Sequence, residues 1–410
     1  MLTDTYVSKA DELIGLENEF GAHNYHSLPV VLNKGEGIYV WDVAGKKYFD
    51  FLSAYSAVNQ GHCHPKIIKS LISQASTLTL TSRAFHSEAL SLFTQFICNY
   101  FGYDKVLPMN TGAEAVETAL KLCRHWAYRV KKIADNKAKI IVCDGNFHGR
   151  TLGIISFSSD PQSKDDFGPF LPGFINIPYN DLAALKEALK EKDVAGFLVE
   201  PIQGEAGVNV PNEGYLSEAK KYCEEANVLF IADEIQTGLG RTGKLLCCDH
   251  EDVKPDILIL GKALSGGTMP VSAVLADNEI MDTIKPGEHG STYGGNPLAC
   301  SVAIESLKVI QDENLVQNAQ EMGNYFRTEI RNLNSPHIKK IRGKGLLNAI
   351  IIQHNDKEAA WKLCLELMKN GLLAKPTHGD KIRLAPPLTI TKGELDKAIM
   401  IIKKSIQILD

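Results

Sequence analysis

Six short apolar runs, separated by segments with helical periodicity, restrict the possible folds of this chain more than any other feature. The runs are rich in β-branched residues and nearly continuous in apolar character, which is typical of strands buried on both faces of a sheet. Strands that alternate with crossover helices predict an α/β fold with a mainly parallel sheet flanked by helices. The expected strands are residues 106–109, 140–143, 197–199, 228–232, 257–260 and 273–276.

Two helices are predicted beside these strands. Val116, Leu120, Cys123 and Ala127 recur every three or four residues, as on the apolar face of an amphipathic helix. A second helix should begin near Pro297, because the fixed φ of proline suits a first helical turn.

The length of the chain suggests more than one domain. At roughly 150 residues per domain, 410 residues correspond to two or three units. Residues 38–49 contain two β-rich runs around a glycine and predict a hairpin. We expect residues 1–60 and 321–410 to form a small α+β domain and residues 61–320 to form the large domain.

Charge and cysteine usage exclude several classes of protein. A net charge of −5 offers no broad positive surface to nucleic acid or to an anionic membrane, so neither is an expected partner. Residues 1–12 lack a basic start and an apolar core, and no C-x-x-C pair occurs among the nine cysteines. These features predict a cytoplasmic protein with reduced thiols. His62, Cys63 and His64 lack a second ligand pair at zinc spacing, so no metal site is predicted.

Two charged residues end successive predicted strands, in FIADEIQTGLGRTGK and DILILGKALSGG. Because ligands gather outside the carboxyl ends of strands in an open α/β sheet, Asp233 and Lys262 should face one crevice. A lysine amine can condense with a pyridoxal aldehyde, and a nearby carboxylate keeps the pyridine nitrogen protonated. Taken singly, Asp233 could be a helix cap and Lys262 a solvated surface lysine. Their joint placement favours the cofactor.

Other residues have types suited to anionic ligands. Gly112 lies in TGAE at a strand-to-helix junction, where free N–H groups can bind phosphate or simply form a capped turn. The glycine-rich stretch HGSTYGGNP is either a second ligand loop or an ordinary connection to a helix. Arg150 and Arg383 can bind carboxylates or form surface ion pairs, and Glu205 can neutralise one of them when no substrate is present.

Long segments spread over nearly the whole chain carry a family resemblance. They include FLSAYSAVNQGHCHP, LPMNTGAEA, GNFHGRTL, VEPIQGEAGV, LFIADEIQTGLGRTG, LGKALSGG, KPGEHGSTYGGNPLA and LLAKPTHGDKIRLAPPL. The chain resembles the class III, fold-type I aminotransferases, and most specifically those that act on the δ-amino group of ornithine. The resemblance implies pyridoxal 5'-phosphate as cofactor, with ornithine and 2-oxoglutarate as substrates. It also implies a link between arginine metabolism and proline biosynthesis.

The resemblance assigns roles to individual residues. Lys262 would bind the cofactor aldehyde, Asp233 the ring nitrogen and Gln236 would lie near the ring hydroxyl. Phe147 would stack on the ring. Thr292 would reach the phosphate from the other subunit, which implies a homodimer with shared sites. The residues implied for cofactor binding are Gly112, Ala113, Phe147, Asp233, Gln236, Lys262 and Thr292.

The resemblance also implies how one pocket serves two substrates. Tyr25 and Arg150 would hold the α-carboxylate of ornithine, and Tyr55 would shape specificity. Arg383 would be masked by Glu205 until 2-oxoglutarate enters and binds Arg383 through its α-carboxylate.

Two departures and two alternatives accompany this interpretation. His148 replaces a tryptophan of related proteins, and Thr268 and Met269 follow the paired glycines where bulkier residues are usual. Both departures bear on substrate preference. The alternatives are an ω-aminotransferase for N-acetylornithine or 4-aminobutyrate, and a non-catalytic scaffold with the same fold.

Overall fold

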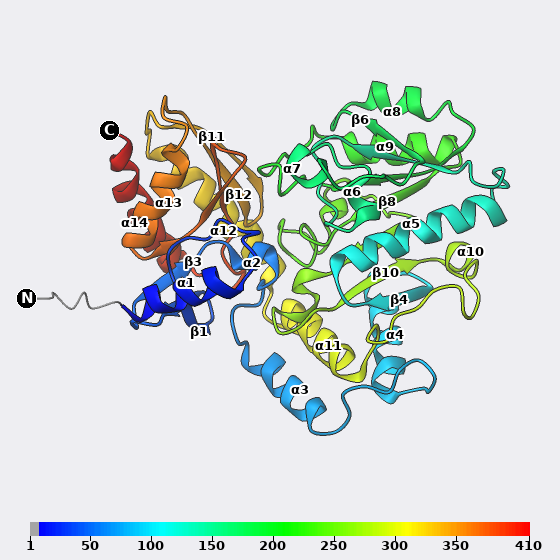
Figure 1. The fold of residues 1–410 in the computed structure, drawn as a ribbon, viewed down its shortest axis with the longest axis horizontal. Coiled ribbons are helices and arrows are strands. Elements are labelled where there is room, and N and C mark those ends of the chain that lie inside the picture. Colours follow the sequence, from blue (N-terminus) through cyan, green and yellow to red (C-terminus); the bar gives the residue numbers. More distant parts are fainter. Residues whose placement is uncertain (1–7) are drawn as a thin grey trace, which may run out of the picture.

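Three sheets organise the chain in the computed structural model, which describes residues 8–410. In Figure 1 the largest sheet lies on the right, and the two smaller sheets lie on the left beside the C-terminus. No helix within residues 8–410 is both long and apolar enough to cross a bilayer. The part of the N-terminal prediction that concerns residues 1–7 lies outside the described residues.

The largest sheet has seven strands in the order β4-β10-β9-β8-β7-β5-β6. Strands β5 to β9 pair in parallel, and β10 is antiparallel to both β9 and β4. The carboxyl ends of β4 and of the parallel strands therefore lie at one edge, and the predicted mainly parallel sheet is confirmed. The strands are β4 (Lys105–Met109), β5 (Lys139–Cys143), β6 (Phe174–Ile177), β7 (Val194–Val199), β8 (Leu229–Asp233), β9 (Ile257–Leu260) and β10 (Ser272–Ala276).

All six predicted strands are present, and the sequence missed one, β6. Every residue of β7, β8, β9 and β10 is buried, which explains their continuous apolar runs. By contrast β6 is one of the two edge strands, and among its four residues only Ile177 is buried. Asn176 interrupts its short apolar run, and a half-exposed strand needs no continuous run.

Helices cover both faces of this sheet. Helix α5 (Gly112–Arg129) packs on one face with Val116, Leu120, Cys123 and Ala127 buried, as predicted. Helices α8 (Leu182–Ala188) and α9 (Tyr215–Glu225) pack on the other face. Helix α11 (Pro297–Asp312) begins at Pro297, as predicted. It packs against α3 (Pro65–Ala75) and α4 (Glu88–Phe101).

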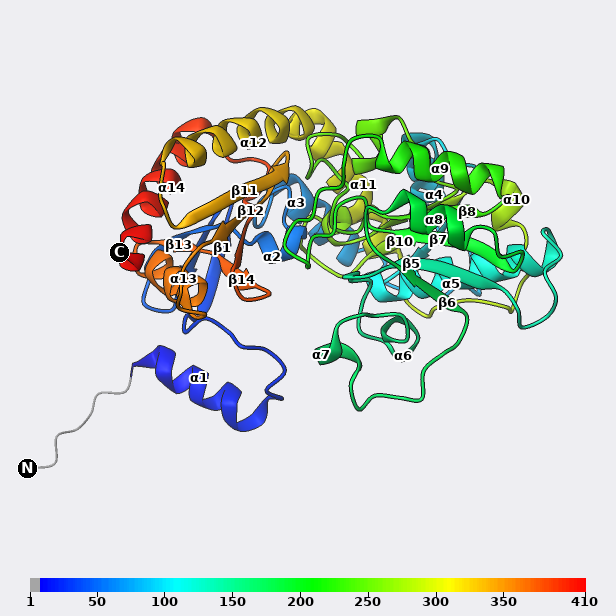
Figure 2. The same ribbon diagram turned by 90° about the horizontal axis from the view of Figure 1, so that it is seen from above.

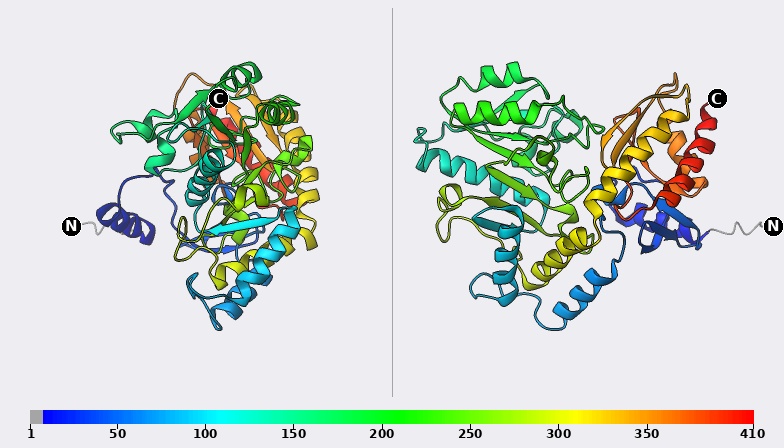
Figure 3. Two further views of the ribbon diagram at one scale, coloured as in Figure 1. Left: turned by 90° about the vertical axis from the view of Figure 1, so that its right-hand side faces the viewer. Right: turned by 180° about the vertical axis from the view of Figure 1, so that it is seen from behind.

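The two small sheets combine segments from both ends of the chain. The predicted hairpin is confirmed as β2 (Tyr39–Asp42) and β3 (Lys47–Asp50), and β3 pairs in parallel with β13 (Leu372–Leu373). Helices α12 and α13 pack against the antiparallel third sheet, and α14 packs against these two helices (Figure 3). The remaining elements are α1 (Lys9–Phe20), β1 (Leu32–Glu36), α2 (Ser53–Ser56), α6 (Leu152–Ile155), α7 (Pro161–Lys164), α10 (Asn278–Met281), α12 (Leu315–Asn332), β11 (Ile338–Lys344), β12 (Leu347–Ile352), α13 (Ala359–Lys369), β14 (Lys375–Thr377), β15 (Lys381–Leu384) and α14 (Lys392–Ser405).

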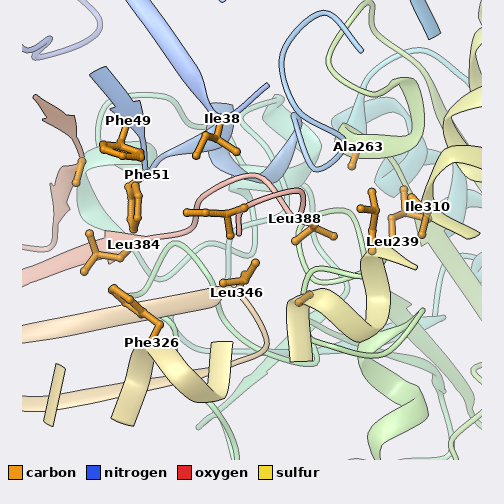
Figure 4. Close-up of a cluster of buried hydrophobic side chains, with 14 of the residues drawn as sticks. Ile38, Phe49, Phe51, Leu239, Ala263, Ile310, Phe326, Leu346, Leu384 and Leu388 are labelled. Atoms are coloured by element: carbon orange, nitrogen blue, oxygen red, sulfur yellow. The ribbon is translucent and has the colours of Figure 1, made fainter. Parts of the chain in front are cut away.

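A single apolar cluster joins the N-terminal strands to the C-terminal third of the chain (Figure 4). Phe51 lies with its ring centroid 6.1 Å from that of Phe326 on α12, and Phe49 and Leu384 lie in the same cluster. Burying each such side chain stabilises the fold by roughly 1.5–3 kcal/mol. The proposed domain boundaries near residues 60 and 320 stay predictions.

Candidate active site

A cavity of about 220 Å³ opens at the carboxyl ends of β4, β5, β7, β8 and β9. Each of these strands, or the turn after it, contributes to the wall, as expected for an open α/β sheet. Seven residues predicted from the sequence meet there: Gly112, Ala113, Phe147, Glu205, Asp233, Gln236 and Lys262. The other lining residues are His148, Gly149, Glu200, Ile202, Ile235 and Thr237.

The N-terminus of α5 forms one wall. Thr111 caps the helix by accepting a hydrogen bond from the N–H of Glu114, and the Glu114 carboxylate accepts from the Thr111 N–H at 2.8 Å. Among residues 8–410 the N–H groups of Gly112 and Ala113 have no such partner. Free N–H groups at the positive end of a helix bind anions such as phosphate.

Asp233 lies buried at the end of β8 and is held by two hydrogen bonds. Its Oδ2 lies 2.6 Å from His148 Nδ1, and its Oδ1 accepts from the N–H of Ile235 at 3.1 Å. Burial lowers the pKa of His148, but the hydrogen bond and the charge of Asp233 outweigh it and raise that pKa overall. The imidazole therefore fixes the carboxylate. In the sequence, His148 was noted only because it replaces a tryptophan of related proteins, and its hydrogen bond to Asp233 was not predicted.

Lys262 follows β9 directly and lines the same cavity. Its φ of 43° lies in the left-handed region, which is strained for a residue with a side chain and is found where a site needs an unusual geometry. Burial lowers the pKa of its amine, with the carboxylates of Glu205 and Asp233 opposing the shift. A lowered pKa leaves more of the amine neutral and nucleophilic.

Glu200 is a second buried carboxyl that sequence reasoning missed. Burial raises its pKa to about 8, although the charge of His148 lowers it. Its Oε2 accepts a hydrogen bond at 3.0 Å from the N–H of Phe147. Glu200 immediately follows the predicted strand 197–199, so the strand-end rule that identified Asp233 would also have found it.

Glu205 connects Gln236 to Arg383. Its Oε1 accepts from Gln236 Nε2 at 3.1 Å and from Arg383 Nη1 at 2.5 Å. Burial raises the pKa of Glu205, but the charge of Arg383 outweighs it and holds that pKa below its usual range. The Tyr55 ring centroid lies 4.8 Å from the Arg383 guanidinium carbon. Arg383 and Tyr55 thus lie behind the lining rather than in it.

Gly204 makes room for this arrangement. A Cβ atom at this position would lie 1.4 Å from Gln236 Oε1, so any other residue would displace the amide.

The chain does not bring every predicted residue to the cavity. Tyr25 is 71% exposed, Thr292 is exposed, and Arg150 is largely exposed with Nη1 3.8 Å from Asp160. Figure 2 shows α1, which precedes Tyr25, projecting on the same side as α6, which follows Arg150. Thr268 and Met269 also lie outside the lining, and so does Thr292.

The residues present fit the cofactor that the resemblance implies. His148 Nε2, Gln236 Oε1 and Arg383 Nε are buried without a hydrogen-bond partner among residues 8–410, which is typical of atoms that a ligand completes. His148 and Gln236 line the cavity together with the Lys262 amine, the Asp233 carboxylate and the free N–H groups of Gly112 and Ala113. These groups suit an aldehyde, a ring nitrogen and a phosphate, in that order.

Comparisons with known proteins agree with this chemistry. The family model described as aminotransferase class-III matches residues 20–406. Rat mitochondrial ornithine aminotransferase is 61% identical over 390 residues, covering 95% of this chain and 89% of the relative. The structure of ornithine aminotransferase from Toxoplasma gondii, described with partial occupancy of PLP at its active site, has a TM-score of 0.96 and 49% identity, covering 98% and 95% of the two chains. Acetylornithine aminotransferase from Elizabethkingia anophelis has a TM-score of 0.90 and 60% identity, covering 98% and 99%.

The prediction of a cytoplasmic protein is wrong by these comparisons. The relatives from rat, Drosophila and Caenorhabditis elegans are named as mitochondrial. Composition and thiol content do not specify a compartment, because a targeting signal is recognised separately from the folded enzyme.

Proposed function

Because the chain belongs to the class-III aminotransferase family, we propose that it transfers the δ-amino group of L-ornithine to 2-oxoglutarate, giving L-glutamate 5-semialdehyde and L-glutamate. The chain is a transaminase that depends on pyridoxal 5'-phosphate, and its fold is fold-type I. When bound, this cofactor supplies an electron sink for the substrate carbon. The reaction links ornithine to proline metabolism.

Residues at the strand ends hold the cofactor. Asp233, fixed by His148, would keep the ring nitrogen protonated, and Phe147 would hold the face of the ring. Gln236 would contact the ring hydroxyl, while Gly112 and Ala113 would bind the phosphate. Two observations support these roles. The N–H groups of Gly112 and Ala113 have no hydrogen-bond partner among residues 8–410, and His148 Nδ1 lies 2.6 Å from Asp233 Oδ2.

Lys262 holds the cofactor through its amine and then moves a proton. The same amine would hold or move the proton of the substrate carbon that bears the amino group. A pKa lowered by burial suits this task, since a general base works best when its pKa is near the operating pH.

The ion pair between Glu205 and Arg383, whose charges act on the Lys262 amine, is the observation that supports the use of one pocket for two substrates. While the pair is closed, the guanidinium is neutralised and the pocket accepts the apolar chain and terminal amine of ornithine. When Glu205 turns away, Arg383 binds the α-carboxylate of 2-oxoglutarate bidentately. One pocket then serves both substrates.

The α-carboxylate of ornithine lies at Tyr25 and Arg150, and Tyr55 shapes specificity. Thr292 of the partner subunit completes the phosphate site, so the active unit is a homodimer. The exposure of Tyr25, Arg150 and Thr292 in the single chain supports this proposal, because a second subunit would cover exposed residues around a shared site.

Competition between amino donors tests the function. Purified holoenzyme should give glutamate 5-semialdehyde from ornithine with a higher kcat/KM than for N-acetylornithine or 4-aminobutyrate, using 2-oxoglutarate as acceptor. N-acetylornithine is the sharper competitor because of the 60% identity to the Elizabethkingia protein. A preference for either rival, identified by its product, would overturn the assignment.

A further inference from the structure

Lys375 is a cation next to the Glu205–Arg383 pair that the proposed mechanism does not use. It begins β14 and lies directly opposite Arg383 on β15 in an antiparallel pair. Residues in such positions have side chains on the same face of the sheet, with Cβ atoms about 5 Å apart. Two residues along, Thr377 donates a hydrogen bond of 2.9 Å to the backbone oxygen of Glu205. The strand is therefore attached to the segment that carries Glu205.

The ammonium group of Lys375 lacks a counter-ion. It is half-buried, and within residues 8–410 it forms no ion pair and no hydrogen bond. Its Nζ lies 5.8 Å from the ring centroid of Tyr25. Burial lowers the pKa of Lys375, as does the like charge of Arg383, while Glu205 opposes both. A partly desolvated cation without an anion is unfavourable, and a bound carboxylate removes that cost.

Lys381 shows what an ordinary lysine of this sheet does. It lies opposite Thr377 on the same face, and its ammonium forms an ion pair of 2.5 Å with Asp380. Lys381 therefore already has its anion, whereas Lys375 does not.

We propose that Lys375 selects the acceptor by supplying a second positive charge for a dicarboxylic oxo-acid. The proposal rests on the function proposed above. With Glu205 in place, Arg383, Glu205 and Lys375 together carry one positive charge. When Glu205 turns away, Arg383 and Lys375 present two positive charges to the two carboxylates of 2-oxoglutarate. Ornithine brings one carboxylate, proposed to lie at Tyr25 near Lys375, and two ammonium groups that a positive charge repels, so its net gain from Lys375 is smaller.

Separate measurement of the two half-reactions tests this in the holoenzyme. For Lys375→Gln we expect the KM for 2-oxoglutarate to rise about tenfold with kcat almost unchanged, as for one charge-assisted contact. The KM for ornithine should change less than about twofold. Binding of glutarate, an unreactive dicarboxylate of the same length, should weaken by the same factor in calorimetry. Lys375→Arg, which keeps the charge, should restore both values.

Lys381→Gln is the matched control, because it removes the same charge from the same face of the sheet and should leave both constants unchanged. Equal losses in Lys375→Gln and Lys381→Gln would show a general charge effect and overturn the proposal. So would equal increases in KM for both substrates, or unchanged glutarate binding. Failure of the proposed function would appear differently, as a wild-type enzyme that prefers another donor.

Discussion

The two sides of the cavity are built in different ways. Of the residues proposed to hold the cofactor, Gly112, Asp233 and Lys262 lie at the ends of strands of one sheet and are buried or half-buried. Of those proposed to bind substrate, Tyr25 and Arg150 lie outside the cavity lining in exposed segments, and Arg383 comes from a different sheet. Hydrogen bonds between strands fix the first set within one rigid unit, whereas the second depends on how separate units meet. Changes on the cofactor side should therefore lower kcat, and changes on the substrate side should raise KM.

The largest effect should come from Lys262→Ala. Loss of the amine removes both attachment of the cofactor and proton transfer, so steady-state kcat should fall by about 10³-fold or more. The yellow absorbance of the purified protein should change at the same time. Lys254→Ala, which removes an exposed lysine paired with Asp277, is the control and should keep full activity. Residual kcat above about a tenth of wild type would contradict the role of Lys262.

Asp233→Asn should have the next largest effect. The amide keeps the shape but removes the negative charge that favours a protonated ring nitrogen, so kcat should fall about 10²-fold with little change in KM. A pH titration of the bound cofactor's absorbance should shift as well. An effect confined to KM would show that Asp233 acts on substrate binding and would contradict its role in holding the cofactor.

Arg383→Gln should separate the two substrates. Loss of a charge-assisted contact with the α-carboxylate should raise the KM for 2-oxoglutarate roughly 10- to 100-fold. The KM for ornithine should change much less, because Glu205 masks the guanidinium during that half-reaction. A fall in kcat for both half-reactions would show that Arg383 acts on the cofactor.

Glu200 provides a pH test of the cofactor side. Its pKa is raised to about 8 in the folded protein but is about 4.3 in an unfolded chain. Between these values the unfolded state releases a proton that the folded state keeps, so this carboxyl lowers stability as pH rises. Glu200→Gln cannot ionise, and its stability relative to wild type should increase by roughly 3–4 kcal/mol from about pH 5 to about pH 8. Urea unfolding at both pH values measures this, and a decrease would exclude a buried neutral carboxyl.

The smallest effect should come from Tyr25→Phe. Loss of one hydroxyl at an exposed position should raise the KM for ornithine about threefold and leave the KM for 2-oxoglutarate unchanged. Tyr128→Phe, which is remote from the cavity, is a matched control. An unchanged KM for ornithine would remove Tyr25 from the substrate site.

Sequence reasoning was most successful where a local pattern carries the information. The buried strands β7 to β10 and the core face of α5 follow directly from apolar periodicity, and Asp233 and Lys262 follow from strand ends. The hydrogen bond between His148 and Asp233 was not predicted, because it joins residues 85 positions apart, one on a loop and the other at the end of β8. Glu200 was overlooked although its strand-end position was visible.

The sequence by itself determined the order of strands and helices and the chemical types available at the strand ends, because both depend on short-range periodicity and on residue identity. The masking of Arg383 by Glu205 was implied by the family resemblance, but only the tertiary structure decided that Lys375 lies opposite Arg383 without an anion of its own. Lys375 and Arg383 become neighbours through strand pairing, and Glu205 joins them from a loop far away in the chain. Electrostatic interaction depends on distance and on exposure to water, and the fold sets both.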